Sequence, residues 1–249
     1  MKQLIAFDLD GTLAESKQAI GDEMGQLLAE LLAVAKVAVI SGGDWPQFET
    51  QVARRIPEGA LLENLFLMPT TGAKLYRFEA GSWREVYAEN FSATEHDRIV
   101  EALEVAAKAL GFDRERTWGP QIENRGSQIT FSALGQQAPL DAKTAWDPDV
   151  SKRRSLQARL NQTLGDLSVK VGGSTSIDIT RKGVDKAYAI QRLAENSGVP
   201  AEAILFLGDA IYPGGNDDPV RAAGVDTVAV RDVQETGSVI RGVIACLKA

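Results

Sequence analysis

The hydrophobic pattern at the start of the chain alternates between short apolar runs and longer amphipathic stretches. The apolar runs, which favour buried strands, are Leu4–Phe7, Val37–Ile40 and Leu65–Met68. Between them, apolar side chains recur three or four residues apart, as they do in amphipathic helices. The succession of strand, helix, strand, helix and strand predicts a parallel sheet wound with helices.

From about residue 74 the pattern changes. Segments 74–78 and 83–87 alternate between apolar and polar positions, which predicts a hairpin with one solvent-facing side. The expected elements that follow are strands at 128–131, 167–171 and 176–180 and helices at 93–110 and 147–164. Paired strands with helices between them are typical of an α+β module. The wound pattern then resumes with a helix at 184–197, strands at 203–207 and 226–230, and a C-terminal helix.

The predicted fold class is α/β, with a doubly wound, Rossmann-like parallel sheet and an inserted α+β module. The first domain is discontinuous and comprises residues 1–80 and 182–249, and the inserted domain comprises residues 81–181. Within the inserted domain, Lys152-Arg153-Arg154 is expected to form the solvated face of a helix.

Composition and charge narrow the range of functions. With 249 residues, 44% of them hydrophobic and 24% charged, the chain has the composition of a globular protein with a sizeable core. The net charge of −7 argues against a nucleic acid or an anionic membrane as partner, because both require a basic surface. No apolar run approaches the length of a membrane span, and we expect a cytoplasmic protein. The single cysteine, Cys246, excludes an internal disulfide, and we expect its thiol to be buried.

Two aspartates, Asp8 and Asp10, follow the first apolar run and precede Gly11-Thr12-Leu13. This position is the carboxyl end of a parallel strand, where open α/β sheets place their ligands. Burying carboxylates costs several kcal/mol each unless a cation neutralises them. The pattern therefore predicts a metal ion, a basic residue or both at this point. A solvated turn that carries two acids is the alternative.

Polar residues follow other predicted strands in the same way. They are Ser41 with Gly42 and Gly43, Lys186 at the start of a helix, and Asp209 with Asp217. Taken singly, the segment at Ser41 could be an ordinary turn, Lys186 a solvated lysine on a helix, and Asp217 a helix cap. Because the carboxyl ends of parallel strands meet at one edge of the sheet, we expect them to converge on Asp8.

The whole chain resembles the haloacid dehalogenase superfamily of phosphotransferases. The segment Asp8-Leu9-Asp10-Gly11-Thr12-Leu13 is similar to its first motif, Ser41 to the second, Lys186 to the third, and Gly208-Asp209 through Gly214-Gly215-Asn216-Asp217 to the fourth. The inserted module is similar to the type IIB cap of Cof-type sugar phosphatases, sucrose-phosphate phosphatase and eukaryotic-type phosphomannomutase, and it resembles the last of these most closely. The resemblance implies that residues 1–80 and 182–249 form a catalytic core and residues 81–181 a substrate-specificity cap.

The resemblance also implies a mechanism, which is Mg²⁺-dependent phosphoryl transfer through an aspartyl phosphate. Asp8 would be the nucleophile and Asp10 the general acid and base. Ser41 and adjacent N–H groups would bind the transferring oxygens, while Lys186 would balance the remaining charge and hold Asp8. The implied Mg²⁺ ligands are Asp8, the backbone carbonyl of Asp10 and Asp209, with Asp217 behind them. The implied substrate-binding residues are Lys17, Gly42, Gly43, Arg116, Arg125, Ser176, Asp178 and Asn216.

One position departs from the mutase pattern. Gln136 stands where the mutase cap has an arginine, so a bidentate phosphate contact is missing. The leading hypothesis is therefore hydrolysis of a small sugar phosphate, and the alternative enzyme is a phosphomannomutase-type phosphohexomutase. A non-catalytic binding protein on the same fold is the alternative from another class. The resemblance further implies a homodimer formed through the cap.

Overall fold

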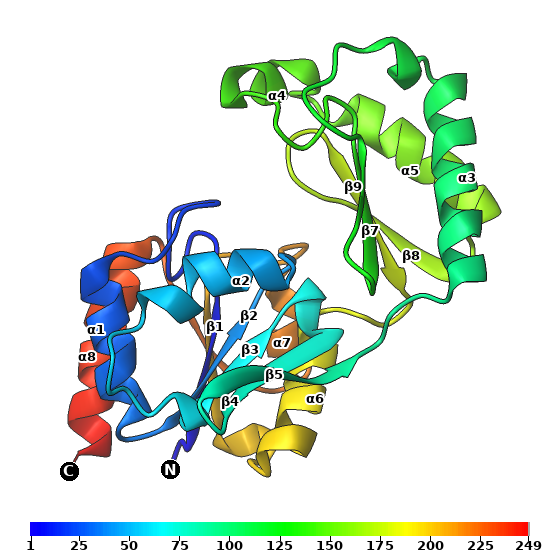
Figure 1. The fold of residues 1–249 in the computed structure, drawn as a ribbon. Helices are drawn as coiled ribbons and strands as arrows, with labels where there is room; N and C mark the ends of the chain where they lie inside the picture. The colour runs from blue at the N-terminus through cyan, green and yellow to red at the C-terminus, as the bar shows by residue number, and fades with distance from the viewer. Residues whose placement is uncertain (249) are drawn as a thin grey trace. The chain divides into compact units, whose positions relative to one another are not determined.

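The computed structural model describes residues 1–248 and divides into two compact units (Figure 1). The first unit joins Met1–Ala88 to the chain from Val184 onward, and the second unit is Glu89–Gly183. The second unit is thus inserted in the sequence of the first.

A mixed sheet forms the centre of the first unit. Its strands are β1 (Leu4–Asp8), β2 (Lys36–Ile40), β3 (Leu65–Met68), β4 (Lys74–Glu79), β5 (Ser82–Ala88), β10 (Ile204–Gly208) and β11 (Asp226–Ala229). They lie in the order β11-β10-β1-β2-β3-β4-β5, parallel from β11 to β3 and antiparallel at β4 and β5. The predicted fold class, a wound parallel sheet, is confirmed.

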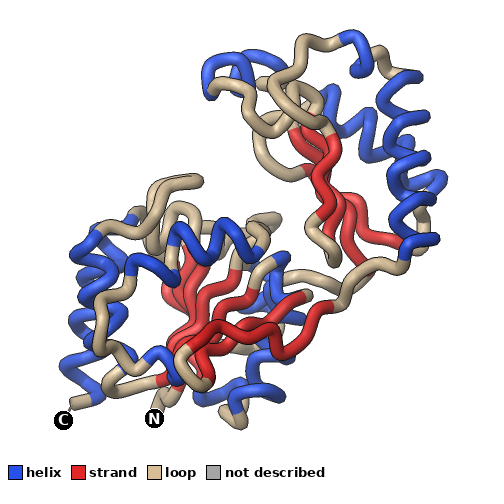
Figure 2. Tube along the Cα trace, in the orientation of Figure 1, coloured by secondary structure: helices blue, strands red, loops and turns tan. Residues whose placement is uncertain are grey.

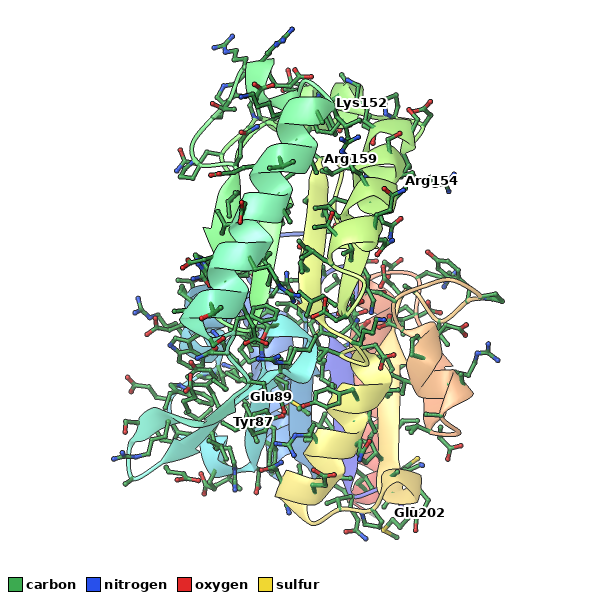
Figure 3. All side chains as sticks on the ribbon, turned by 90° about the vertical axis from the view of Figure 1, so that its right-hand side faces the viewer. Tyr87, Glu89, Lys152, Arg154, Arg159 and Glu202 are labelled. Atoms are coloured by element: carbon green, nitrogen blue, oxygen red, sulfur yellow. The ribbon has the colours of Figure 1, made fainter. Side chains whose placement is uncertain are left out.

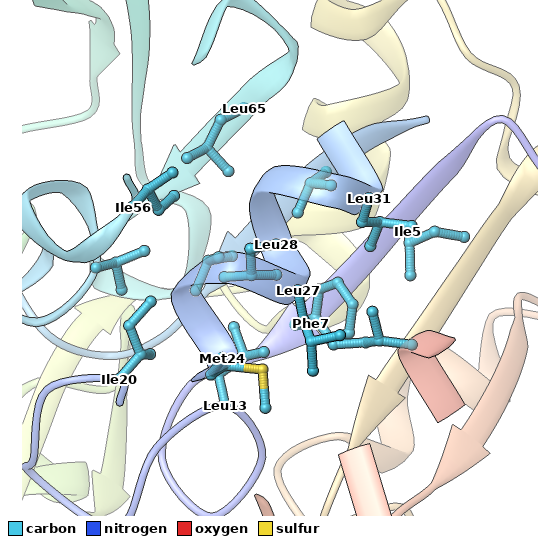
Figure 4. Close-up of a cluster of buried hydrophobic side chains, with 14 of the residues drawn as sticks. Ile5, Phe7, Leu13, Ile20, Met24, Leu27, Leu28, Leu31, Ile56 and Leu65 are labelled. Atoms are coloured by element: carbon cyan, nitrogen blue, oxygen red, sulfur yellow. The ribbon is translucent and has the colours of Figure 1, made fainter. Parts of the chain in front are cut away.

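Successive residues of β1 point to opposite faces of the sheet, and all of them are buried. Helices therefore cover both faces of this sheet. The α-helices are α1 (Asp22–Leu32), α2 (Trp45–Gln51), α6 (Lys186–Ser197), α7 (Asp218–Ala222) and α8 (Val233–Leu247). The shorter 3₁₀ turns are η1 (Ala53–Arg55), η2 (Leu62–Asn64), η3 (Thr70–Gly72) and η5 (Ala201–Ala203). Ile5 and Phe7 belong to the core under α1 and α8 (Figure 4), whereas Leu4 and Ala6 belong to the core under α6 and α7.

The second unit has an antiparallel sheet in the order β6-β7-β9-β8. Its elements are β6 (Ile122–Asn124), β7 (Gln128–Ser132), β8 (Leu167–Val171), β9 (Ser176–Arg181), α3 (Ala93–Ala109), η4 (Phe112–Arg114), α4 (Leu140–Trp146) and α5 (Ser151–Thr163). Figure 2 shows α3 and α5 on the same side of these strands. The apolar residues of β7 and β9, such as Ile129 and Ile177, pack beneath these helices. The alternating positions Gln128, Thr130 and Asp178 therefore lie on the opposite, polar face.

Two boundaries differ from the sequence-based expectation. Strand β5 pairs with β4 along its length, so residues 81–88 lie in the first unit and the division falls after Ala88. The second division falls after Gly183, two residues later than expected. The helix expected at 147–164 begins at Ser151, and a separate helix, α4, precedes Asp147.

Two side chains also differ from expectation. Arg153 does not lie on the solvated face of α5, because its guanidinium turns inward to the buried carboxylate of Asp147, 2.8 Å away. Figure 3 labels its neighbours Lys152 and Arg154, and also Arg159, on α5. Cys246 is exposed on α8 rather than buried. Across residues 1–248, no helix is both long and apolar enough to cross a membrane.

Candidate active site

Asp8 is the last residue of β1, and its side chain is almost completely buried. The residue pairs with Ile40 on β2, so Ser41 leaves the neighbouring strand directly beside it. Burial raises the pKa of Asp8 to about 6 and Asp217 adds to the rise, although Lys186 acts in the opposite direction. In this buried position, the ionised form of the Asp8 carboxyl group therefore has to be stabilised by a cation.

Lys186 supplies a cation at this point. It is the first residue of α6, and Asp185 caps that helix by accepting a hydrogen bond from the N–H of Tyr188. The buried ammonium lies 2.6 Å from Oδ1 of Asp8 and also contacts Oδ1 of Asp217. Burial lowers the pKa of Lys186, but the two carboxylates outweigh burial and hold the pKa above its ordinary value.

Three carboxylates gather around this ammonium. Asp209 follows β10 and Asp217 precedes α7, where its Oδ2 accepts a hydrogen bond of 3.0 Å from the N–H of Ala210. One oxygen each from Asp8, Asp209 and Asp217 lies within 4.8 Å of the others. Loss of hydration and the charge of Asp217 raise the pKa of Asp209, the exposed member.

This cluster fits a divalent cation. Three ionised carboxylates beside one ammonium leave a formal charge of −2, which such an ion would balance. Hard cations take oxygen ligands at about 2.0–2.6 Å, and oxygens this close can share one ion. Asp8, Asp209 and Asp217 are thus the side chains that could hold a metal.

Two glycines allow the acids to approach the backbone. Gly11 has a φ of +83°, and a Cβ there would overlap Oδ2 of Asp209. A Cβ on Gly208 would overlap Oδ2 of Asp217. A side chain at either position would displace a carboxylate of the cluster.

Asp10 faces a different partner. Its Oδ1 accepts a hydrogen bond of 2.5 Å from the backbone N–H of Lys17, a residue with a φ of +62°. The Asp10 carboxylate is not a member of the three-acid cluster. The side chain of Lys17 is exposed, so the backbone of Lys17, rather than its ammonium, fixes the orientation of Asp10.

The loop after β2 is held from two sides. The N–H groups of Thr71 and Thr70 donate to the carbonyl oxygens of Ser41 and Gly43, at 2.9 and 2.8 Å. Asp44 begins α2 through a capping box with Gln47, and its Oδ1 accepts from Lys74 Nζ at 2.6 Å. Gly42 and the largely buried Ser41 are therefore part of a fixed loop at the carboxyl end of the sheet.

A second polar cluster lies within the inserted unit. Oδ1 of Asp178 accepts hydrogen bonds from Thr130 Oγ1 at 2.7 Å and from Gln128 Nε2 at 3.1 Å. Burial raises the pKa of Asp178. Arg125 forms an ion pair of 2.7 Å with Glu123 on β6.

The other expected substrate residues lie at separate places. Ser176 begins β9. The guanidinium of Arg116 lies over the ring of Trp118, 4.6 Å from its centroid. Asn216, in the segment between β10 and α7, is exposed. The sequence motifs did not mark Gln128 and Thr130 beside Asp178, although the alternation of polar and apolar residues along β7 could have placed them on its polar face.

The sequence profile of the haloacid dehalogenase-like hydrolases matches residues 5–212, and the chain belongs to this family. The resemblance to the haloacid dehalogenase superfamily that the motifs indicated is confirmed. The protein is therefore an enzyme. Among curated relatives, the phosphomannomutase of Encephalitozoon cuniculi is 26% identical over 232 residues, which cover 87% of this chain and 83% of the relative. The probable phosphomannomutase of Caenorhabditis elegans is 26% identical over 227 residues, which cover 89% and 87%.

A solved structure shows the same fold. The haloacid dehalogenase-like hydrolase from Bacteroides thetaiotaomicron aligns with a TM-score of 0.68 at 16% sequence identity. The alignment covers 98% of this chain and 100% of the other. The similarity therefore extends over both units of the chain.

Proposed function

We propose that this protein is a magnesium-dependent phosphatase that hydrolyses a small sugar phosphate through an aspartyl phosphate on Asp8. The observation that carries the proposal is the buried contact between Asp8 and Lys186, with two further carboxylates at the same edge of the sheet. Lys186 favours the ionised form of Asp8, which is the form that can attack phosphorus.

Asp8 and Asp10 divide the chemistry between them. Asp8 attacks the phosphorus atom while Asp10 protonates the departing sugar oxygen. Asp10 then takes a proton from the water molecule that cleaves the aspartyl phosphate. The N–H of Lys17 keeps the Asp10 carboxylate in one orientation for both proton transfers.

The phosphoryl oxygens are held by the hydroxyl of Ser41 and the backbone of Gly42 and Gly43. The carboxylates of Asp8 and Asp209, which belong to the three-acid cluster, and the backbone carbonyl of Asp10 would hold Mg²⁺, and Asp217 would support them without contacting the ion. Bound Mg²⁺ supplies positive charge that offsets the repulsion between an anionic nucleophile and a phosphate ester.

The polar face of the inserted sheet is the proposed receptor for the sugar. Asp178 offers oxygen acceptors and Ser176 a hydroxyl donor that suit a polyol, and the buried Thr130 orients the Asp178 carboxylate. Arg125 is paired with Glu123, so this part of the face carries no net positive charge. It therefore suits neutral hydroxyl groups better than a second phosphate.

The second candidate is a phosphohexomutase, which the similarity to phosphomannomutases favours. Gln136 stands against it, because an amide cannot replace the bidentate phosphate contact of an arginine. Mannose 1-phosphate with MgCl₂ separates the two: the phosphatase releases mannose and phosphate, whereas the mutase yields mannose 6-phosphate.

The deciding experiment is a screen of phosphorylated sugars with MgCl₂ that measures free phosphate and isomerised sugar. Asp8→Asn should abolish turnover, and Glu101→Gln on the exposed face of α3 should leave it unchanged. Normal turnover by Asp8→Asn would exclude the proposed mechanism.

A further inference from the structure

A left-handed turn lies directly beside the loop that carries Ser41. Thr70, Thr71 and Gly72 form η3 and have φ values of +48°, +57° and +83°. Glycine adopts such left-handed backbone angles readily, whereas a non-glycine residue held in this conformation costs about 1–3 kcal/mol. Such residues persist only where the surrounding structure enforces them, and they cluster at functional sites.

Two neighbours enforce the turn. On one side, the N–H groups of Thr70 and Thr71 donate to the carbonyl oxygens of the Ser41 loop. On the other side, Gly72 packs so closely against α6 that a Cβ on Gly72 would overlap the side chain of Ala189. The turn is thus fixed between the loop of Ser41 and the helix that begins with Lys186.

The side chain of Thr71 points to the loop as well. A Cβ placed on Gly42 would have Oγ1 of Thr71, 3.9 Å away, as its nearest non-adjacent atom. Thr71 is half-buried, and within residues 1–248 its hydroxyl makes no hydrogen bond, whereas Thr70 is fully buried. A hydroxyl donor therefore borders the loop that the proposed mechanism uses to hold phosphate.

We propose that Thr71 is a further phosphate-binding residue, whose hydroxyl donates a hydrogen bond to an oxygen of the transferring phosphoryl group. The assignment rests on the phosphoryl-transfer function proposed above and adds a residue outside the four sequence motifs. It also accounts for a threonine at a position where glycine would relieve the backbone, because glycine would lack the hydroxyl.

The test is calorimetric titration of inorganic phosphate in the presence of MgCl₂. Thr71→Val keeps the branched shape but removes the hydroxyl, and it should weaken phosphate binding by about tenfold or more. Thr71→Ser keeps the hydroxyl and should bind within about twofold of the wild type. Thr71→Gly should also bind more weakly, yet melt at the same or a higher temperature, because the strained φ is relieved.

Wild-type affinity in Thr71→Val, or no phosphate binding by the wild-type protein, would overturn the assignment. If Thr71→Val does not fold, the difference between Thr71→Ser and Thr71→Gly decides the same question. Failure of the proposed function looks different: phosphate binding would still depend on the Thr71 hydroxyl, but no phosphate ester would be hydrolysed.

Discussion

The ammonium of Lys186 lies 2.6 Å from Oδ1 of Asp8, and the two side chains expose only 3% and 6% of their surface. Residues 178 positions apart in the sequence thus form an ion pair from which water is nearly excluded. Removing one partner of such a pair leaves the other charge buried and uncompensated, which is costly.

Lys186→Met should therefore destabilise the protein by about 3–5 kcal/mol at neutral pH, because Asp8 and Asp217 lose their shared cation. Urea unfolding measures the loss, and MgCl₂ should restore part of it. Lys182→Met removes an exposed lysine four positions earlier in the sequence and should change stability little. A Lys186→Met protein as stable as the wild type would contradict the role of the ion pair.

Magnesium should stabilise the folded protein through the three-acid cluster. At a concentration of about 100 times the dissociation constant, the expected gain is about 2.7 kcal/mol. Asp209→Asn should reduce this response and, without metal, leave the melting temperature equal or higher, since one of three like charges is gone. Thermal melting against MgCl₂ concentration tests both points, with Asp113→Asn as an exposed control. Equal responses in both variants would argue against metal binding by the cluster.

Asp10→Asn should slow the chemical step by about 10²–10⁴ and leave substrate binding largely intact. The amide oxygen can still accept the hydrogen bond from the N–H of Lys17, but the side chain can no longer donate or accept the transferred proton. Steady-state kinetics on the best substrate of the screen separate kcat from KM. A large rise in KM with unchanged kcat would assign Asp10 to binding instead.

Acid should weaken the inserted unit through Asp147. Burial raises the pKa of Asp147, but hydrogen bonds from the side chain and N–H of Arg153 and from the N–H of Lys152 outweigh it and hold the pKa below its ordinary value. The ionised carboxylate therefore contributes stability above about pH 4, and this contribution is lost as the pH falls through the folded-state pKa.

Asp147→Asn should lose about 3–5 kcal/mol at pH 7, and the difference from the wild type should narrow below pH 4. Urea midpoints between pH 7 and pH 3 measure this trend. Asp166→Asn breaks an exposed pair with Arg98 and should change the urea midpoint little at pH 7, because solvent screens such a pair. A difference that is independent of pH would show that the charge of Asp147 does not contribute.

Gly208→Ala and Gly242→Ala should have opposite effects. A Cβ on Gly208 would overlap the Asp217 carboxylate, so we expect a loss of roughly 1–3 kcal/mol and weaker binding of MgCl₂. Gly242 lies within α8 with open space around its Cα, so alanine should stabilise the protein by about 0.5–1 kcal/mol. Urea unfolding of the two variants tests the pair, and equal effects would contradict the packing argument.

The wound sheet could be predicted because its signal is local. Strands β1, β2, β3 and β10 are short runs in which almost every residue is buried, and Asp8, Ser41 and Asp209 end or directly follow such runs. Parallel strands bring their carboxyl ends to one edge, so strand assignment alone brought these residues together. The unit to which the expected hairpin of β4 and β5 belongs could not be predicted in the same way, because its alternation fits either unit and only the pairing of β4 with β3 assigns it.

The sequence by itself determined the wound order of strands and helices and the polar residues that follow the parallel strands, because side-chain periodicity and strand direction act over a few residues. Only the tertiary structure decided that Arg153 turns inward to Asp147, that Lys17 holds Asp10 through its backbone, and that Thr71 adopts a left-handed conformation. Each of these depends on packing between segments or on a conformation that the residue type disfavours. The free energy that selects each of these conformations comes from contacts with residues outside the local sequence.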